Sequence, residues 1–217
     1  MIITCIGHAM FLLELSNGMR IVTDPVDTSS GYPVQPVACD AVLVSHGHHD
    51  HCAMEAVRGA SSVIDTAGEY TLSPDVSVSA VQAFHDDVRG AKRGKTLLFI
   101  IEAEGLRVAH LGDLGHIPEK DQLDALKNID VLLTPVGGVY TINAEQAKAT
   151  ADLVKPSVIL PMHYRTDKNA DWPISPVTDF TILFSKEDVR EQKLIRITAG
   201  DLMCQPKVCV LEAQLKG

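Results

Sequence analysis

The sequence contains no apolar run long enough to cross a membrane. Its longest apolar stretches, residues 96–101 and 158–162, fall far short of the roughly 20 residues that a spanning helix needs. The first ten residues also lack the basic region that opens a secretory signal peptide, so we expect them to form a strand. We therefore expect a cytoplasmic protein with no membrane partner.

Paired cysteines and an excess of basic residues are also missing. The five cysteines are an odd number without C-x-x-C spacing, which indicates free thiols in a reducing compartment. The 19 basic and 28 acidic residues give a net charge of −9, and such a negative field repels phosphate backbones. Nucleic acid is accordingly an unexpected partner, and no pattern indicates whether the chain forms a homo-oligomer.

Neither an internal repeat nor a Ser/Gly-rich linker divides the 217 residues, so we expect a single domain spanning residues 1–217. Hydrophobic residues make up 46% of the sequence and charged residues 22%. This balance allows the chain to bury a sizeable core, which offsets the entropy lost on ordering.

The turn residues predict strands in the first half of the chain. Asn17-Gly18 separates the apolar runs 11–15 and 19–23, which is a strong hairpin signal. A second hairpin is predicted for residues 96–103 and 106–111, because Gly105 between them can adopt a positive φ. Residues 76–81 are predicted to form another strand.

Helices are predicted between the later strands. Asn143 and Gln146 form a capping-box pattern for a helix from residue 144 to 155, which Pro156 stops. Pro118 is predicted to occupy the first position of another helix. Strands interspersed with helices indicate an α/β fold with mixed sheets.

The segment His46-Gly47-His48-His49-Asp50-His51 carries the clearest chemical signal. Four histidines and one aspartate follow a buried-strand pattern at residues 41–44. Side chains alternate in an extended segment, so His46 and His48 can chelate one ion while Asp50 and His51 face a second. A solvated polar loop is the alternative, and His49 is expected to be solvated.

Three further candidate ligands stand just past predicted strands. His85 follows residues 76–81, Asp113 follows residues 107–112, and His163 follows residues 158–162. Open α/β folds gather ligands at the carboxyl ends of their strands, so we expect these side chains to converge. The alternatives are a surface histidine at 85, a turn-shaping aspartate at 113 and a core histidine at 163.

In this order the motifs resemble those of the metallo-β-lactamase-fold hydrolases, namely H-x-H-x-D-H followed by a lone His, a lone Asp and a lone His. The resemblance covers nearly the whole chain. It implies a four-layer αββα sandwich of two mixed sheets flanked by helices. It also implies that His46, His48 and His85 hold one ion, that Asp50, His51 and His163 hold the other, and that Asp113 bridges them.

Shorter motifs narrow the resemblance. Single-domain hydrolases related to L-ascorbate-6-phosphate lactonase are similar at four motifs, which are Gly7-His8, Thr23-Asp24-Pro25, Gly112-Asp113-Leu114-Gly115-His116 and Pro161-Met162-His163-Tyr164. Imidazole and carboxylate ligands suit two Zn²⁺ ions, although Mn²⁺ or Fe²⁺ can bind the same set. Flavodiiron relatives typically carry Glu where His48 stands, and this difference favours hydrolysis over redox chemistry.

Outside the ligand set, four residues are candidates for supporting roles. Asp24 could fix the tautomer of a ligand histidine, or it could be a turn aspartate before Pro25. We expect His8 to bind substrate and His116 to protonate the leaving group, although either could be structural. Arg93, in the basic loop at residues 89–95, could clamp an anion, whereas a solvated loop is the plainer interpretation.

These residues predict a dinuclear metal-dependent hydrolase. We expect it to cleave an ester or lactone bond of a small anionic metabolite by a metal-bound hydroxide that Asp50 orients. A phosphodiesterase or nuclease using the same centre is an alternative. A metal-binding sensor without useful turnover is another.

Overall fold

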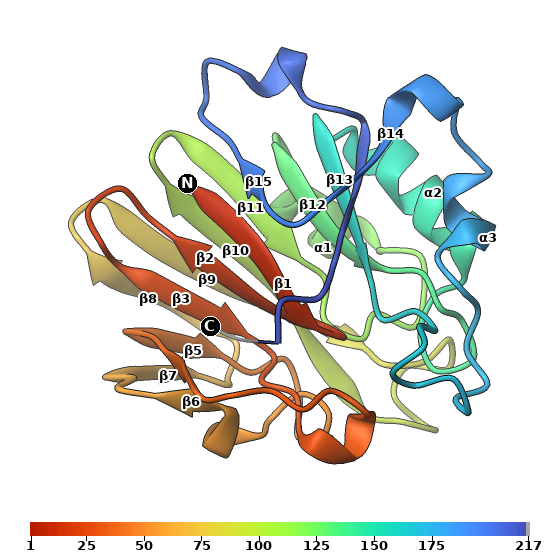
Figure 1. Ribbon diagram of the computed structural model, residues 1–217, viewed down its shortest axis with the longest axis horizontal. Coiled ribbons are helices and arrows are strands. Elements are labelled where there is room, and N and C mark those ends of the chain that lie inside the picture. The colour runs from red at the N-terminus through yellow and green to blue at the C-terminus, as the bar shows by residue number, and fades with distance from the viewer. Residues whose placement is uncertain (216–217) are drawn as a thin grey trace.

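The first part of the chain forms most of one β-sheet (Figure 1). The computed structural model describes residues 1–215. In spatial order the strands of this sheet are β15 (Ile195–Arg196), β1 (Ile2–Gly7), β2 (Met10–Glu14), β3 (Arg20–Thr23), β5 (Ala41–Leu43) and β7 (Ser62–Ile64). The β2–β3 hairpin confirms the Asn17-Gly18 prediction, and Gly18 has the left-handed φ of 88° that its turn requires.

A second, mixed sheet packs against the first. In spatial order its strands are β14 (Val189–Gln192), β16 (Val208–Leu211), β13 (Val158–Met162), β12 (Val131–Pro135), β11 (Leu106–His110), β10 (Lys95–Ala103), β9 (Val76–Phe84) and β8 (Gly68–Ser73). The β10–β11 hairpin is confirmed, with Glu104 and Gly105 at φ 57° and 72°. Strand β9 runs past the predicted end at residue 81 and stops directly before His85.

Three α-helices occur in the described residues: α1 (Lys120–Ala125), α2 (Ala144–Val154) and α3 (Thr178–Thr181). Helix α2 confirms the predicted capping box, because the Asn143 side chain accepts a hydrogen bond from the Gln146 N–H at 2.9 Å. Helix α1 begins at Lys120, so the predicted position of Pro118 inside it is wrong. The Gln122 side chain accepts from the Glu119 N–H at 2.7 Å and sets the helix start there. No helix among residues 1–215 is both long and apolar enough to span a membrane.

The layers outside the two sheets differ from each other. Residues of α1, α2 and α3 pack on the outer face of the second sheet, for example Ala147 on Leu132 within one cluster. Over the first sheet, the described residues show no α-helix. They show instead β4 (Val37–Ala38) paired with β6 (Val57–Arg58) and the short 3₁₀ turns η1 (Thr28–Ser30) and η2 (Met54–Ala56). A helix is unfavourable in this segment because it contains three prolines, Pro25, Pro33 and Pro36. Two further 3₁₀ turns, η3 (Lys186–Asp188) and η4 (Leu202–Cys204), lie near the C-terminus.

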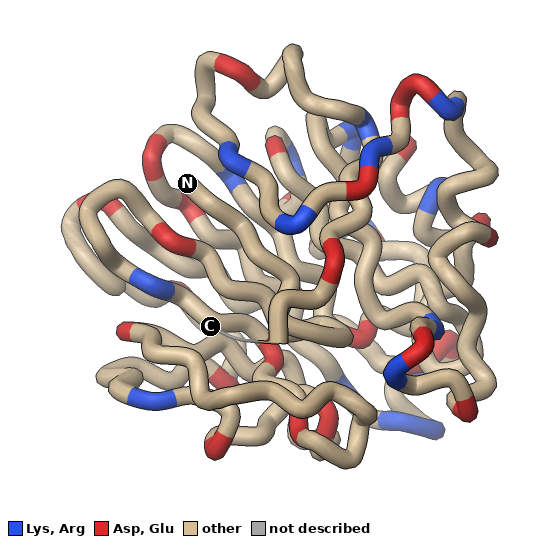
Figure 2. Tube along the Cα trace, in the orientation of Figure 1, with Lys and Arg blue, Asp and Glu red and all other residues tan. Residues whose placement is uncertain are grey.

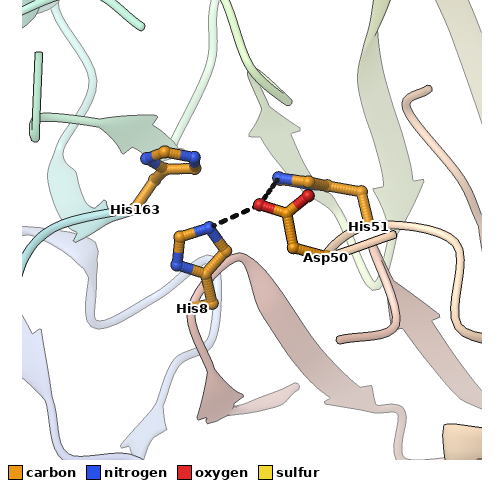
Figure 3. A group of neighbouring side chains, drawn as sticks. All are labelled: His8, Asp50, His51 and His163. Carbon is orange, nitrogen blue, oxygen red and sulfur yellow. Dashed lines mark ion pairs between the residues drawn. The ribbon is translucent and has the colours of Figure 1, made fainter. Parts of the chain in front are cut away.

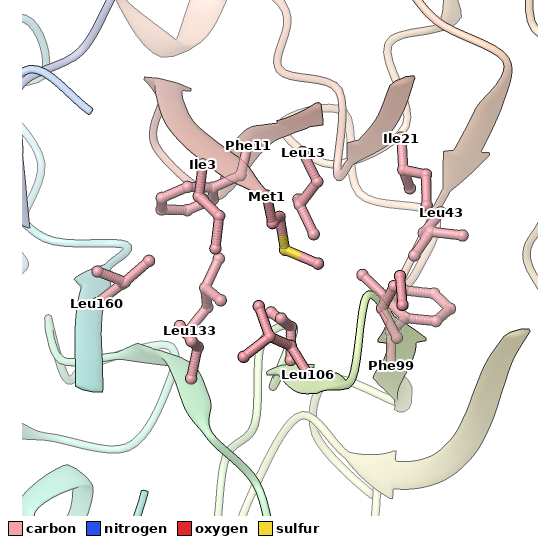
Figure 4. Close-up of a cluster of buried hydrophobic side chains, with 14 of the residues drawn as sticks. Met1, Ile3, Phe11, Leu13, Ile21, Leu43, Phe99, Leu106, Leu133 and Leu160 are labelled. Atoms are coloured by element: carbon pink, nitrogen blue, oxygen red, sulfur yellow. The ribbon is translucent and has the colours of Figure 1, made fainter. Parts of the chain in front are cut away.

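The main hydrophobic core lies between the two sheets (Figure 4). Ile3, Phe11 and Leu13 of the first sheet face Leu133 and Leu160 of the second. Each of these five side chains is at most 1% exposed. The packed sandwich fixes the strand ends, and the polar segments that follow β5, β9, β11 and β13 meet at one edge.

Candidate metal centre

Three histidines cluster at the outer side of this edge. His46 and His48 follow β5, and His85 follows β9. His46 Nε2 lies 3.0 Å from His48 Nδ1, and the His85 ring centroid lies 4.8 Å from that of His46. One donor atom from each side chain lies within 4.8 Å of the others, and His48 is exposed. These three imidazoles could hold one metal ion.

A second group is formed by His8, Asp50, His51 and His163, which are all buried. Figure 3 shows how these four side chains lie around one another. Asp50 Oδ2 lies 3.6 Å from His51 Nε2 and 3.4 Å from His8 Nε2. The rings of His8 and His163 are 4.1 Å apart between centroids. Donor atoms of all four residues lie within 4.8 Å of one another, so this group could also hold a metal ion. The structure thus places His8 with the candidate ligands.

Asp113 lies between the two groups. Its Oδ2 is 3.2 Å from His85 Nε2 and 3.3 Å from His163 Nε2, while its Oδ1 is 3.2 Å from His51 Nε2. The preceding Gly112 has a φ of 50°, and a Cβ there would approach the Leu97 carbonyl oxygen to 2.7 Å. Only glycine fits this turn, which carries Asp113 from the end of β11 into the centre.

Asp24 is connected by hydrogen bonds to one histidine of each group, on the Nδ1 side of the ring. Its Oδ2 accepts hydrogen bonds from His51 Nδ1 at 2.9 Å and from the Ser45 hydroxyl at 2.7 Å. The Ser45 oxygen in turn lies 2.9 Å from His46 Nδ1, which donates to it. Because both Nδ1 atoms carry the proton, the Nε2 lone pairs of His46 and His51 face the centre. Asp24 thus contacts His51 directly and His46 through Ser45.

Burial and charge act on these groups in opposite directions. Burial lowers the pKa of His46 to about 3, and burial together with His163 lowers the pKa of His8 to about 4. Neutral imidazole is the form that binds metal. Burial opposes ionisation of Asp113, yet His163 and His51 hold its pKa well below the ordinary value. Burial also disfavours charge on His51, but Asp113 and Asp24 raise its pKa well above normal. The anionic surroundings therefore favour a cation.

Unpaired polar atoms test whether the site suits a metal. Within the described chain, two buried atoms that face the centre lack a hydrogen-bond partner, His51 Nε2 and Asp113 Oδ1. Each such atom costs about 1–3 kcal/mol when left unsatisfied. Imidazole nitrogens and carboxylate oxygens are the donors that zinc uses, so the residues fit a metal centre.

A cavity of about 430 Å³ opens onto the centre. Arg93 lines it, with its guanidinium 5.6 Å from the centroid of the Tyr140 ring. Trp172 also lines the cavity and lies 6.5 Å from His163 between ring centroids. Exposed Lys92 pairs with Asp87 and exposed Arg89 pairs with Glu119, and Lys95 is not among the residues that line the cavity. Arg93 is thus the loop cation that reaches the cavity.

The buried Asp86 shapes the loop that presents Arg93. Its two carboxylate oxygens accept four backbone hydrogen bonds between 2.7 and 2.9 Å, from the N–H groups of Val88, Gly90, Lys92 and Arg93. Because Asp86 directly follows His85, the cavity loop is tied to the metal centre through one residue.

Other candidate residues lie outside the centre. His116 Nε2 accepts from the Phe84 N–H at 3.3 Å, and its Nδ1 donates to the Ile117 carbonyl at 2.8 Å. Both ring nitrogens serve the backbone, which argues against the expected role of leaving-group acid. His49 is exposed and lies 3.2 Å from Asp27, as expected for a solvated residue.

Sequence reasoning missed several residues around the centre. Ser45 connects Asp24 with His46, and its position next to the histidine motif was a usable signal. Tyr140 and Trp172 line the cavity from loops after β12 and β13, and no local motif marks them. His110 donates from Nε2 to the Ala9 carbonyl at 3.0 Å, which joins the β1–β2 turn to β11.

Comparisons with known proteins identify the family to which the chain belongs. Residues 2–163 match the family model described as a beta-lactamase superfamily domain. A UPF0173 metal-dependent hydrolase of Archaeoglobus fulgidus is 34% identical over 194 residues, covering 76% of this chain and 83% of the relative. Its counterpart from Carboxydothermus hydrogenoformans is 30% identical and covers 79% and 86%.

A solved structure extends the similarity to the whole fold. It is a Thermotoga maritima protein described as a proposed zinc-dependent hydrolase of the metallo-β-lactamase superfamily. The two chains are 39% identical with a TM-score of 0.78, and the alignment covers 98% of this chain and 99% of the other. The expected metallo-β-lactamase fold with two mixed sheets is confirmed, whereas in the described residues α-helices cover only the second sheet.

Proposed function

Because the chain belongs to the UPF0173 metal-dependent hydrolases of the β-lactamase superfamily, we propose that it cleaves an ester or lactone bond of a small anionic metabolite. The observation that carries this proposal is one continuous site. Two clusters of metal-binding side chains share Asp113, and a cavity lined by Arg93 opens onto them.

In this proposal the centre holds two divalent ions, most simply zinc. His46, His48 and His85 hold one, Asp50, His51 and His163 hold the other, and Asp113 lies between them. Bound there, such ions supply an acidified water molecule and polarise the oxygen of the scissile bond. The same donors accept Mn²⁺ or Fe²⁺, so the native metal is decided by its availability as well as by the ligands.

The protein's own residues provide orientation and charge. Asp50 lies in the buried group and also lines the cavity, so it can orient the attacking water beside the substrate. Arg93 can pair with a phosphate or carboxylate of the substrate through two parallel hydrogen bonds. Tyr140 and Trp172 line the cavity and can offer apolar faces to the substrate body.

A phosphorylated lactone is the substrate type that the motifs around His8, Asp24, Asp113 and His163 favour, through their resemblance to L-ascorbate-6-phosphate lactonase. Phosphodiester cleavage is the second candidate, because the same centre can serve it. Figure 2 shows basic and acidic residues interspersed over the outer loops, a pattern that suits a small substrate better than a long phosphate backbone.

A substrate screen tests the proposal. Metal-loaded protein is offered lactones, simple esters, phosphodiesters and thioesters, each in an anionic and a neutral form, with and without a chelator. We expect the highest kcat/KM on an anionic lactone or ester and loss of turnover on chelation. A preference for nucleic acid or for neutral substrates would contradict the substrate class. Two bound ions without turnover on any member would favour the sensor alternative.

A further inference from the structure

His8 occupies the turn between β1 and β2 and does not face the substrate cavity. Its side chain is 0% exposed, and the residues that line the Arg93 cavity do not include it. It borders a separate cavity of about 310 Å³, together with Tyr32 and Tyr164. A substrate held by Arg93 would meet His48, Asp50 and His163. The structure therefore does not support His8 as a direct substrate contact.

The backbone holds His8 in a costly conformation. Its φ of 56° lies in the left-handed region, as does the φ of 52° at His163. A residue other than glycine held in this way costs on the order of 1–3 kcal/mol, and such strain gathers at ligand sites. The surrounding structure enforces it, because His163 N–H donates to the His8 carbonyl and His110 fixes the next carbonyl, that of Ala9.

The His8 imidazole also lacks partners. Neither Nδ1 nor Nε2 makes a hydrogen bond within residues 1–215, although both are buried. The nearest opposite charge is Asp50 Oδ2, 3.4 Å from Nε2. The strained backbone thus places a buried, unpaired imidazole so that one of its nitrogens lies within 4.8 Å of donor atoms of Asp50, His51 and His163.

We propose that His8 is a protein ligand of the second metal ion, beside Asp50, His51 and His163. The inference rests on the proposed dinuclear centre. Three imidazoles and one carboxylate supply four donors of the kinds that zinc uses, and Asp113 lies beside them. All four residues are buried, whereas the first group includes the exposed His48. The two groups therefore differ in burial, although Asp50 and His163 of the second group also line the cavity.

Cobalt titration of the metal-free full chain tests this ligand. Wild-type protein and the variants His8→Ala, His8→Gln and His8→Gly are titrated with Co²⁺. Bound ions are counted by elemental analysis, and the visible absorption and the fluorescence of the single Trp172, 5.1 Å from His8, are recorded. Glycine accepts the left-handed backbone, and glutamine keeps a hydrogen-bond donor near Asp50 without an imidazole. His49→Gln is the matched control, because exposed His49 belongs to none of the candidate groups.

We expect two Co²⁺ per chain in the wild type and in His49→Gln. The three His8 variants should bind the first ion unchanged and the second at least about tenfold more weakly, since even residues behind the ligands change affinity 10- to 100-fold. The absorption of the second site should weaken in parallel. Two ions bound by His8→Gly or His8→Gln with wild-type affinity and spectrum would overturn the His8 inference but leave the proposed dinuclear centre standing. Failure of the wild type to bind two ions would instead contradict the proposed centre.

Discussion

At the scale of single residues, Asp50 connects the buried group of candidate ligands with the substrate cavity. It contacts His51 and His8 within the centre and also lines the substrate cavity. We expect Asp50→Ala to lower kcat by about 10²–10³-fold or more, because the variant loses both a ligand and the group that orients water. Its thermal unfolding should remain cooperative. Near wild-type kcat in this variant, with steady-state kinetics and circular dichroism measured together, would refute the role of Asp50.

The predicted preference for anionic substrates depends on Arg93. A bidentate hydrogen bond to an anion contributes about 1.5–3 kcal/mol, so Arg93→Ala should weaken binding of anionic esters roughly 10- to 150-fold. Neutral esters should be unaffected. Lys92→Ala is the matched control, because Lys92 lies on the same loop and pairs with Asp87 outside the cavity. Equal losses on charged and neutral substrates would exclude an anion clamp.

Asp24 acts on the centre through the residues that it holds. Asp24→Asn preserves the shape and tolerates the φ of 40°, but it removes a carboxylate that accepts from both His51 and Ser45. Metal affinity should fall about 10- to 100-fold, as expected for the loss of a hydrogen-bonded carboxylate behind a ligand. Competition with a chromogenic chelator measures this change. An unchanged affinity would show that the Asp24 network is not needed to orient His51.

At the scale of elements, the loop at residues 86–94 depends on Asp86. Asp86→Asn replaces one acceptor oxygen by an amide that cannot accept, so two of the four backbone hydrogen bonds lose their partner. Because the amide nitrogen can take the place of either oxygen, we expect faster amide exchange at one of two pairs, Val88 and Gly90 or Lys92 and Arg93, and a higher KM for anionic substrates. Amides of β10, which lies directly after the loop, serve as the internal reference. Unchanged exchange at all four loop amides would mean that Asp86 is not what holds the loop.

Local chemistry explains which elements the sequence could predict. Asn17-Gly18, Gly105 and the Asn143–Gln146 capping box each act within a few residues, and the structure confirms all three elements. The ligand-bearing segments were predictable for a related reason, since polar side chains directly after apolar strands meet at a sheet edge. The start of α1 was missed because Glu119 and Gln122 cap it, which a proline rule alone does not detect.

Other parts of the site depend on contacts between distant segments. Tyr140 and Trp172 come from loops whose course is set by packing beyond β12 and β13, and periodicity carries no information about it. The place of His8 depends on β1 lying beside the loop after β13 and on a left-handed backbone that no motif indicates. The cover of the first sheet by 3₁₀ turns likewise follows from long-range packing of residues 24–60.

At the scale of the whole molecule, the chain has a net charge of −9 and contains a cluster of carboxylates and imidazoles that are mostly buried. Cations are favoured at such a site. With the two proposed divalent ions bound, they and Arg93 would supply local positive charge, so the protein-wide negative field would not prevent anion binding. The fold contributes by bringing the ends of β5, β9, β11 and β13 together with the β1–β2 turn. Single strands cannot hold either ion alone.

The central claim is that this fold assembles a dinuclear hydrolytic centre, and counting metal ions while following turnover tests it most directly. Metal-free protein is titrated with Zn²⁺, and bound ions per chain and hydrolysis of an activated ester are measured at each step. Two ions should bind per chain, and hydrolysis should rise as the centre fills and disappear on chelation. Binding that stays near zero with zinc, manganese and iron, or turnover that persists in metal-free protein, would contradict the account.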